Sequence, residues 1–329
     1  MNIIKRAILT TLSITSLCLS QSALSTETWD MPMAYSATNY HSELAAQFAK
    51  DVNAQIGDEI EIVTHPGGSL YKGNEIFGAL RRGLAPIGER LISALGNENP
   101  IFEVDALPFV ATSFDDSWKL YQTSKPAMEK VLNKKGLKLL YTVPWPPQGL
   151  YSNKPIHAIS DMKGLKFRAY NSLTLDIAVM MGAIPTKIEA AELSQAFATG
   201  VAQSMFSSGS TGYDRKLWEY VTYWYDTKAW LPKNMVVVNK RAWKSLSQKA
   251  QNIILSVSEK TEKAGWAKAE ALTDWYKTEL AKHGMTVSNP SEKLQSDFKA
   301  LGEQVVADWL KKSGTDGQEL IDNYNRGIQ

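Results

Sequence analysis

One arginine, Arg168, stands where a short strand should give way to a helix. Residues 165–170 alternate between apolar and polar side chains, as a strand does, and Ser172 can cap a helix over residues 173–181. Open α/β sheets bind ligands at the carboxyl ends of their strands, where a helix N-terminus adds N–H donors. A guanidinium there can bind a carboxylate through two parallel hydrogen bonds. Arg168 is therefore a candidate anion clamp, the alternative being an exposed strand arginine in a surface ion pair.

Enzyme motifs are missing from the sequence. It has no glycine-rich phosphate loop, no dinucleotide-binding glycine pattern, no His-Glu-x-x-His and no Gly-x-Ser-x-Gly. Ser160 and Lys163 match the Ser-x-x-Lys of penicillin-binding enzymes, and Lys312-Ser313-Gly314 loosely matches a second motif, but Ser-Asp-Asn is missing. The four histidines are scattered at spacings unlike a metal site: His41, His65, His157 and His283. We expect no enzyme, no metal and no cofactor, with a secreted Ser-x-x-Lys hydrolase as the alternative.

The N-terminus has the layout of a cleavable secretory signal. Lys5 and Arg6 precede an apolar run over residues 7–19, and small and polar residues follow up to Ser25. The run is shorter than the ~20 apolar residues of a membrane span. Cys18, the single cysteine, lies within it after Leu17, whereas lipid attachment normally requires a small residue there. We predict export to the periplasm, which leaves no thiol for a disulfide, a metal site or catalysis.

The predicted mature chain is electrically balanced and long. Residues 1–25 contain two basic residues and no acidic one, so 34 basic and 34 acidic residues follow. This balance does not favour nucleic acid. No later stretch approaches the length of a membrane span, so we expect a soluble protein. We also expect a monomer. A chain of this length exceeds what one core usually supports, so two lobes are expected.

Short β-type runs alternate with helical patterns, which indicates an α/β architecture with mostly parallel sheets. Residues 143–149, rich in proline, read as a stiff connection between the lobes. The proline-free stretch over residues 243–283, broken only by Gly265, is predicted to form one extended helix or two end to end. A further helix is predicted over 293–312, ended by Gly314. The predicted division is a signal peptide at 1–25, lobe I at 26–147, lobe II at 148–235, a return to lobe I with a helix spanning both lobes at 236–282, and C-terminal helices packing across the lobes at 283–329.

Three segments resemble a known family. They are Asp-Met-Lys-Gly-Leu-Lys-Phe-Arg at 161–168, Met-Gly-Ala-Ile-Pro at 181–185 and Glu-Leu-Ser-Gln-Ala-Phe-Ala-Thr-Gly-Val at 192–201. In order and spacing they are similar to the extracytoplasmic solute-binding proteins of TRAP transporters, the DctP family. The resemblance implies a two-lobed periplasmic binding protein of type II-like Venus-flytrap fold, with Arg168 gripping the carboxylate of a small organic acid. It also implies delivery to the small and large membrane subunits of an ion-driven, ATP-independent transporter, the alternative destination being a membrane sensor.

Two departures from the family pattern bear on the ligand. Many members have a second arginine where this chain has Gly149, and an asparagine where it has Ser207, with Ser208 and Thr211 nearby. A buried charge without a partner is costly, so losing a cation argues against a second carboxylate. We therefore expect one carboxylate on a partly apolar body, which leaves aromatic, branched hydroxy and small peptide-like or amide-bearing acids open.

The remaining candidates are side chains in segments that should line the cleft. Each aromatic ring could instead belong to a lobe core, and Glu75 and Glu89 could be solvated ends rather than partners of a ligand amine or hydroxyl. The residues expected to bind the ligand are Arg168, Tyr170, Trp145, Gln148, Tyr151, Ser207, Ser208, Tyr213, Trp230 and Glu89.

Overall fold

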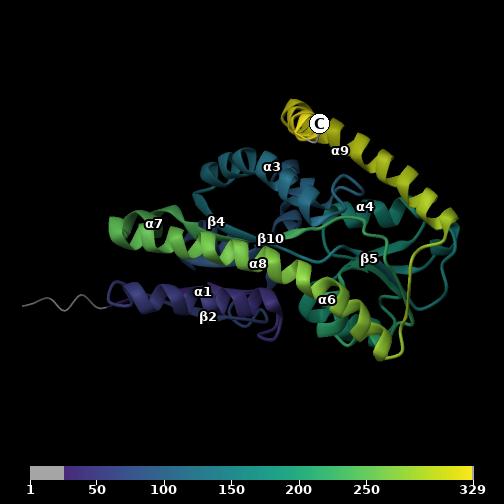
Figure 1. Cartoon of the computed structure of the whole chain (residues 1–329), viewed down its shortest axis with the longest axis horizontal. Helices are drawn as coiled ribbons and strands as arrows, with labels where there is room; N and C mark the ends of the chain where they lie inside the picture. Colours follow the sequence, from purple (N-terminus) through teal and green to yellow (C-terminus); the bar gives the residue numbers. More distant parts are fainter. Residues whose placement is uncertain (1–25, 328–329) are drawn as a thin grey trace, which may run out of the picture.

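The structure, a computed structural model, describes residues 26–327 and shows two lobes built on separate sheets (Figure 1). The predicted signal peptide lies outside the described residues. Within them, no helix combines the length and the apolar character needed to cross a bilayer.

Lobe I contains two small sheets. The first pairs β1 (Glu27–Pro32) with β2 (Ile60–His65) in parallel, and the second has the order β3 (Ile87–Leu91), β10 (Lys233–Asn239), β4 (Leu137–Pro144), all antiparallel. The main helices of this lobe are α1 (Tyr40–Ile56), α2 (Gly73–Arg82), α3 (Phe114–Lys134) and α7 (Lys240–Ser245), and the 3₁₀ turns are η1 (Ile92–Leu95) and η2 (Pro100–Ala106).

Lobe II is built on one six-stranded sheet. Its order is β11 (Thr286–Ser288), β9 (Tyr223–Tyr225), β5 (Gly149–Ser152), β8 (Ser204–Ser207), β6 (Lys166–Ala169), β7 (Ile184–Lys187). The lobe's helices are α4 (Ser172–Met180), α5 (Leu193–Ala198) and α6 (Gly209–Asp214), with 3₁₀ turns η3 (Ile159–Met162), η4 (Ala190–Glu192) and η5 (Leu217–Glu219). Strand β6 is parallel to both β7 and β8, whereas β5 is antiparallel to β8 and β9.

The sheets are therefore less parallel than the sequence predicts. In lobe I, β10 returns from lobe II and inserts between β3 and β4, so it runs against both of them. Alternating strand and helix signals do not reveal a returning strand of this kind, because its direction depends on where the chain crosses between lobes.

Two long helices bridge the lobes (Figure 1). Helix α8 (Gln248–Lys282) packs on α1 and β4 of lobe I and on α6 of lobe II. It begins later than predicted, because Ser247 caps it by accepting a hydrogen bond from the Ala250 N–H, and α7 is a separate short helix. Gly265 does not interrupt α8. A Cβ there would lie 2.7 Å from Val143 Cγ2, so glycine allows the helix to approach β4 closely.

The segment α9 (Glu292–Arg326) consists of two helices that meet at a kink at Gly314. Gly314 ends the first helix, as predicted, because its φ of 62° and ψ of −145° are non-helical values that glycine adopts readily, and a second helix follows up to Arg326. The second segment stays against lobe I, where the Tyr324 hydroxyl donates to Val110 O at 3.1 Å. The first segment reaches α4 of lobe II, so α9 also contacts both lobes.

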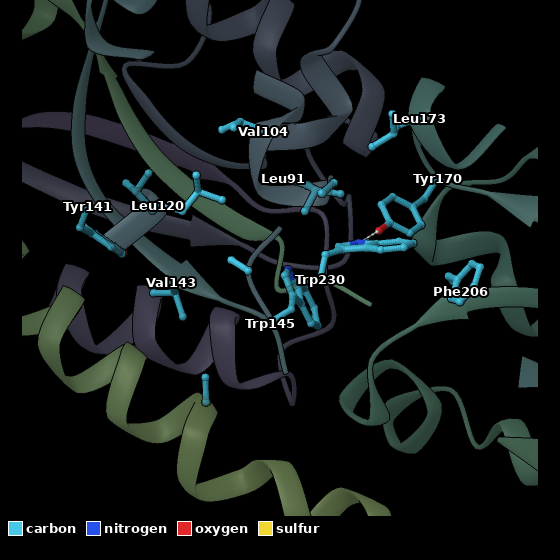
Figure 2. Close-up of a cluster of buried hydrophobic side chains, with 14 of the residues drawn as sticks. Leu91, Val104, Leu120, Tyr141, Val143, Trp145, Tyr170, Leu173, Phe206 and Trp230 are labelled. Atoms are coloured by element: carbon cyan, nitrogen blue, oxygen red, sulfur yellow. Dashed lines mark hydrogen bonds between the residues drawn. The ribbon is translucent and has the colours of Figure 1, made fainter. Parts of the chain in front are cut away.

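The apolar core is continuous between the lobes. One cluster of buried side chains includes Tyr141 and Val143 of lobe I and Tyr170 and Phe206 of lobe II. Figure 2 shows Trp145 and Trp230 lying between these two groups. The two crossing segments that carry these tryptophans run side by side, because Trp145 N donates to Pro232 O at 2.8 Å and Gln148 N to Trp230 O at 2.9 Å. The lobes thus share a hydrogen-bonded ribbon at the back of the cleft.

Candidate ligand-binding site

A cavity between the lobes contains Arg168 in its wall. The empty space within it, counted out into the solvent at its open mouth, is about 520 Å³. Lobe I and the crossing segments contribute Ala34, Tyr35, Arg90, Leu91, Trp145, Gln148 and Pro232. Lobe II contributes Arg168, Tyr170, Glu189, Ala190, Ser207, Ser208 and Thr211.

Arg168 lies near the carboxyl end of β6, between β7 and β8, and is only 5% exposed. Its Nε donates to Ile188 O at 3.0 Å, and its guanidinium carbon lies 5.1 Å from the centre of the Tyr170 ring. Within residues 26–327 no protein acceptor takes a hydrogen bond from its terminal nitrogens, and Arg168 is one of the residues that line the cavity. Burial lowers the pKa of the guanidinium, but an arginine stays charged in proteins. The wall therefore presents a fixed positive charge with donors to spare.

Helix α4 follows Arg168 closely, as expected, but its cap differs. Asn171 is the N-cap and accepts a hydrogen bond from Thr174 N at 2.8 Å. Ser172 is the first helical residue, and its hydroxyl donates to Glu103 of lobe I at 2.7 Å. The prediction of Ser172 as the cap is wrong by one residue, because the asparagine side chain competes for the same position.

Six of the predicted contact residues line the cavity: Arg168, Tyr170, Trp145, Gln148, Ser207 and Ser208. Several are held in place by other contacts. The Tyr170 hydroxyl accepts from Trp230 Nε1 at 2.8 Å, as Figure 2 shows. Gln148 Nε2 donates to Pro146 O at 3.1 Å, and Ser208 caps α6 by accepting from Thr211 N at 3.2 Å. Burial raises the pKa of the Tyr170 hydroxyl, so this side chain is neutral.

The other four lie outside the lining of the cavity. Tyr151 is buried in lobe II, where its hydroxyl donates to Ser208 O at 2.9 Å. Tyr213 packs against Trp275 and Tyr276, and Trp230 supports Tyr170 from behind. Glu89 is 3% exposed, and its carboxylate is 3.6 Å from His41 Nδ1 inside lobe I.

Strand alternation explains why Glu89 lies outside the lining, since neighbouring side chains of a strand point to opposite faces and Arg90 lines the cavity. Burial raises the pKa of the Glu89 carboxyl to about 7. Glu75 lies outside the lining as well, because it accepts a hydrogen bond from Lys72 N at the start of α2.

Among the aromatic and charged residues of the lining, sequence reasoning missed three, namely Tyr35, Arg90 and Glu189. Arg90, near the carboxyl end of β3, is 4% exposed, and its Nη1 lies 3.4 Å from Glu189 Oε2 of lobe II. The strand-end argument that identified Arg168 applies equally to Arg90. The inference that the cavity lacks a second cation is therefore wrong. The structure explains why position 149 has a glycine and not the family's arginine. A Cβ there would lie 2.5 Å from the Trp224 ring, so no side chain fits.

The residues of the Ser-x-x-Lys match are not in this cavity. Ser160 and Lys163 are both exposed at the surface turn η3 and its end. In the described part of the chain, Lys163 contacts Ser160 through a backbone hydrogen bond, N to O, at 3.2 Å. Within residues 26–327, the Ser160 hydroxyl forms no hydrogen bond with a basic side chain that could activate it.

Comparison with known proteins agrees with this geometry. Residues 33–313 match the model of the bacterial extracellular solute-binding protein family 7, DctP. The structure is similar to that of DctP6, a Bordetella pertussis extracytoplasmic solute receptor binding pyroglutamic acid, at 47% identity over 91% of this chain and 99% of that chain, with a TM-score of 0.89. A marine metagenome TRAP solute-binding protein specific for pyroglutamate is 46% identical over 92% of this chain and 99% of that one, with a TM-score of 0.90. The sialic acid-binding periplasmic protein SiaP of Vibrio cholerae is 24% identical over 97% of this chain and 94% of its own length.

Proposed function

Because the chain belongs to family 7 of the bacterial extracellular solute-binding proteins, the DctP family, we propose that it is a pyroglutamate receptor that holds the ligand's carboxylate on Arg168. Members of this family are solute-binding receptors and not enzymes, and the family predicted from three sequence segments is confirmed. The Ser-x-x-Lys alternative is set aside.

The observation that carries the proposal is the state of the Arg168 guanidinium. It is buried, oriented by Ile188 O and the Tyr170 ring, and its terminal nitrogens have no protein acceptor within residues 26–327. A carboxylate bound there would gain charge-assisted hydrogen bonds of about 1.5–3 kcal/mol each. The two solved relatives at 46% and 47% identity are a pyroglutamate-specific protein and a receptor that binds pyroglutamic acid, which supports this acid among those the sequence left open.

The walls of the cavity also suit a small ring. Tyr35, Trp145 and Tyr170 supply aromatic surface, while Gln148 and Ser207 supply polar atoms. Pyroglutamate combines one carboxylate with a five-membered lactam. It therefore fits the expectation of a single carboxylate on a partly apolar, amide-bearing body.

The proposal includes the receptor's place in transport. A ligand that contacts both lobes stabilises the closed form by its differential affinity for that form. We propose that the liganded, closed monomer in the periplasm delivers its acid to the small and large membrane subunits of a TRAP transporter. The lining residues from both lobes support the first step, and family membership supports the second.

Calorimetry on protein that has been unfolded and refolded to remove carried-over ligand tests the proposal. Wild-type protein should bind L-pyroglutamate, and Arg168→Ala should lose about 2–5 kcal/mol, or roughly 30- to 4,000-fold in Kd. Arg241→Ala, which changes an exposed arginine of α7, should bind like the wild type. Wild-type affinity in Arg168→Ala would refute the clamp. No heat with pyroglutamate, while another acid of a carboxylate panel binds, would refute the ligand.

A further inference from the structure

Arg90 and Glu189 meet across the cavity from opposite lobes. Arg90 Nη1 lies 3.4 Å from Glu189 Oε2, and Arg90 Nη2 lies 3.5 Å from Oε1, so the two groups face each other in a paired arrangement. These distances exceed the 2.7–2.9 Å typical of charge-assisted hydrogen bonds. Each group therefore keeps capacity for another partner, and Arg90 Nε is buried without a hydrogen bond among the described residues.

Gly73, at the start of α2, leaves the space in which this pair forms. A Cβ at Gly73 would lie 2.7 Å from Glu189 Oε2 and 2.8 Å from Arg90 Nη1. Both atoms are the far ends of flexible side chains, so a methyl group there would displace the pair without disturbing the backbone. The pair is thus a defined part of the cavity wall that a small change can move.

The charges lining the cavity come from three side chains, Arg90, Arg168 and Glu189. Burial raises the pKa of the lining tyrosines Tyr35 and Tyr170, so they remain neutral. Two guanidinium groups and one carboxylate leave the cavity with the net charge of a single cation. A monoanion neutralises it, whereas a dianion would leave one buried negative charge without compensation, which is costly.

We propose that the Arg90–Glu189 pair determines the receptor's specificity, so that the cavity accepts a monocarboxylate with a neutral amide edge and rejects the dicarboxylate of the same length. This inference rests on the proposed function, because it concerns the ligand of the same cavity. Arg90 supplies N–H donors and Glu189 supplies acceptor oxygens. A lactam presents the complement, a C=O acceptor beside an N–H donor, whereas a second carboxylate presents acceptors alone.

The pair also couples specificity to closure. Arg90 belongs to lobe I and Glu189 to lobe II, so the pair can form only when the lobes come together. A ligand that bonds to both partners keeps them close. A dicarboxylate would compete with Glu189 for Arg90 and separate the two lobes at this point, since like charges repel.

Glu189→Gln tests the inference, with L-pyroglutamate and glutarate as probes. Glutarate has the same five-carbon chain, with a second carboxylate in place of the lactam carbonyl. The variant keeps the shape of the side chain but frees the charge of Arg90. We expect the glutarate Kd to fall, and the ratio of the two Kd values to move at least about tenfold toward glutarate. Glu192→Gln, an exposed glutamate of the neighbouring turn, is the matched control and should leave the ratio unchanged.

Gly73→Ala provides a second, independent variant. It should shift the same ratio in the same direction as Glu189→Gln, because the added methyl group displaces both charged ends. An unchanged ratio in Glu189→Gln overturns the inference. A wild-type protein that does not bind pyroglutamate overturns the proposed function instead, and the glutarate measurements then decide the inference alone: a gain in Glu189→Gln supports it, and no gain refutes it.

Discussion

Arg168 keeps a full charge inside the protein with few partners to offset it. Its one hydrogen bond to another residue in the described part of the chain uses Nε, and it is 5% exposed. A buried, under-compensated charge is unfavourable. An anion that enters the cavity would relieve this cost in addition to forming its own hydrogen bonds, as the proposed carboxylate clamp requires.

Arg168→Lys distinguishes the shape of the guanidinium from its charge. A lysine keeps the charge but cannot form two parallel hydrogen bonds with a carboxylate or retain the contact with Ile188 O. Losing one charge-assisted hydrogen bond costs about 1.5–3 kcal/mol, so calorimetry should give a Kd for the bound carboxylate weaker by roughly 10- to 150-fold. Arg241→Lys at the surface of α7 serves as the control. Full affinity in Arg168→Lys would mean that charge alone suffices.

The sequence could predict Arg168 but not its partners, for reasons that differ from residue to residue. Arg168 lies in a segment whose apolar and polar residues alternate as in a strand, and a segment with a clear helical pattern comes soon after it. All five residues of β3 are buried, so Arg90 and Glu89 cannot be assigned to opposite faces from their pattern. Glu189 follows β7 in a loop, and its role depends on the other lobe. Tyr151 and Tyr213 show the opposite error, since an aromatic ring near the cleft can equally pack in a lobe core.

At the scale of elements, α8 depends on one close contact with lobe I. Gly265 faces Val143 of β4, and a Cβ would lie 2.7 Å from Val143 Cγ2 and 3.1 Å from Cγ1. Both residues are buried, and Val143 belongs to the core shared by the two lobes. Helix propensity favours alanine over glycine by about 1 kcal/mol, but overpacking in a core costs typically about 1–3 kcal/mol. The clash should therefore outweigh the gain.

Gly265→Ala should lower the free energy of unfolding in urea, and Val143→Ala should do so as well by removing buried methyl groups. The double variant should lose less than the sum of the two single changes, because the smaller side chain on β4 makes room for the new methyl group. Strictly additive losses of unfolding free energy would show that the side chains of α8 and β4 do not clash at this contact. Gly78→Ala in α2 is the control. Its nearest neighbour is the flexible end of Arg82, at 3.2 Å, so helix propensity should make this change stabilising.

Element positions were easier to predict than element directions. The strand that contains Arg168, the helix after it and the long bridging helix all follow from periodicity and capping residues. The antiparallel placement of β10 between β3 and β4 does not. It is decided by the return crossing, which lies on the ribbon of residues 145–148 and 229–232, and no local pattern encodes which strands a crossing segment will join.

At the scale of the whole molecule, three contacts tie the two lobes together in addition to the Arg90–Glu189 pair. The crossing ribbon lies at the back, and Glu103 of lobe I accepts from Ser172 of α4 and pairs with Lys312 of α9. At the rim, Asn39, the N-cap of α1, donates to Asp214 of α6 at 2.6 Å. The backbone beside the ribbon is strained, since Lys228 and Phe109 have φ values of 46° and 61°. Opening must break the rim contact, whereas the ribbon can bend.

The rim contact should make ligand affinity depend on pH. Burial raises the pKa of the Asp214 carboxyl to about 6, opposed by the hydrogen bond from Asn39 and the charge of Arg215, and Glu43 of α1 adds a weaker upward effect. In an open form Asp214 would be solvated, with a pKa near the ordinary value of ~4. A carboxyl whose pKa is higher in the closed form takes up a proton on closure. Closure is therefore favoured at low pH and loses this contribution as pH rises through about 6.

With these pKa values, affinity should be roughly fourfold higher at pH 5.5 than at pH 7.5. Calorimetry with the bound carboxylate at both pH values measures this change of affinity with pH, the pH slope. The carboxylate of the ligand and the guanidinium of Arg168 both stay charged between pH 5.5 and 7.5, so neither contributes to the pH slope. Asp214→Asn keeps a hydrogen-bonding partner for Asn39 but cannot titrate, and it should remove the slope while leaving affinity at pH 5.5 near that of the wild type. Glu89 and Asp105 also have raised pKa values, of about 7 and about 6, so a slope that persists in Asp214→Asn would assign the proton to the interior of lobe I instead of the rim.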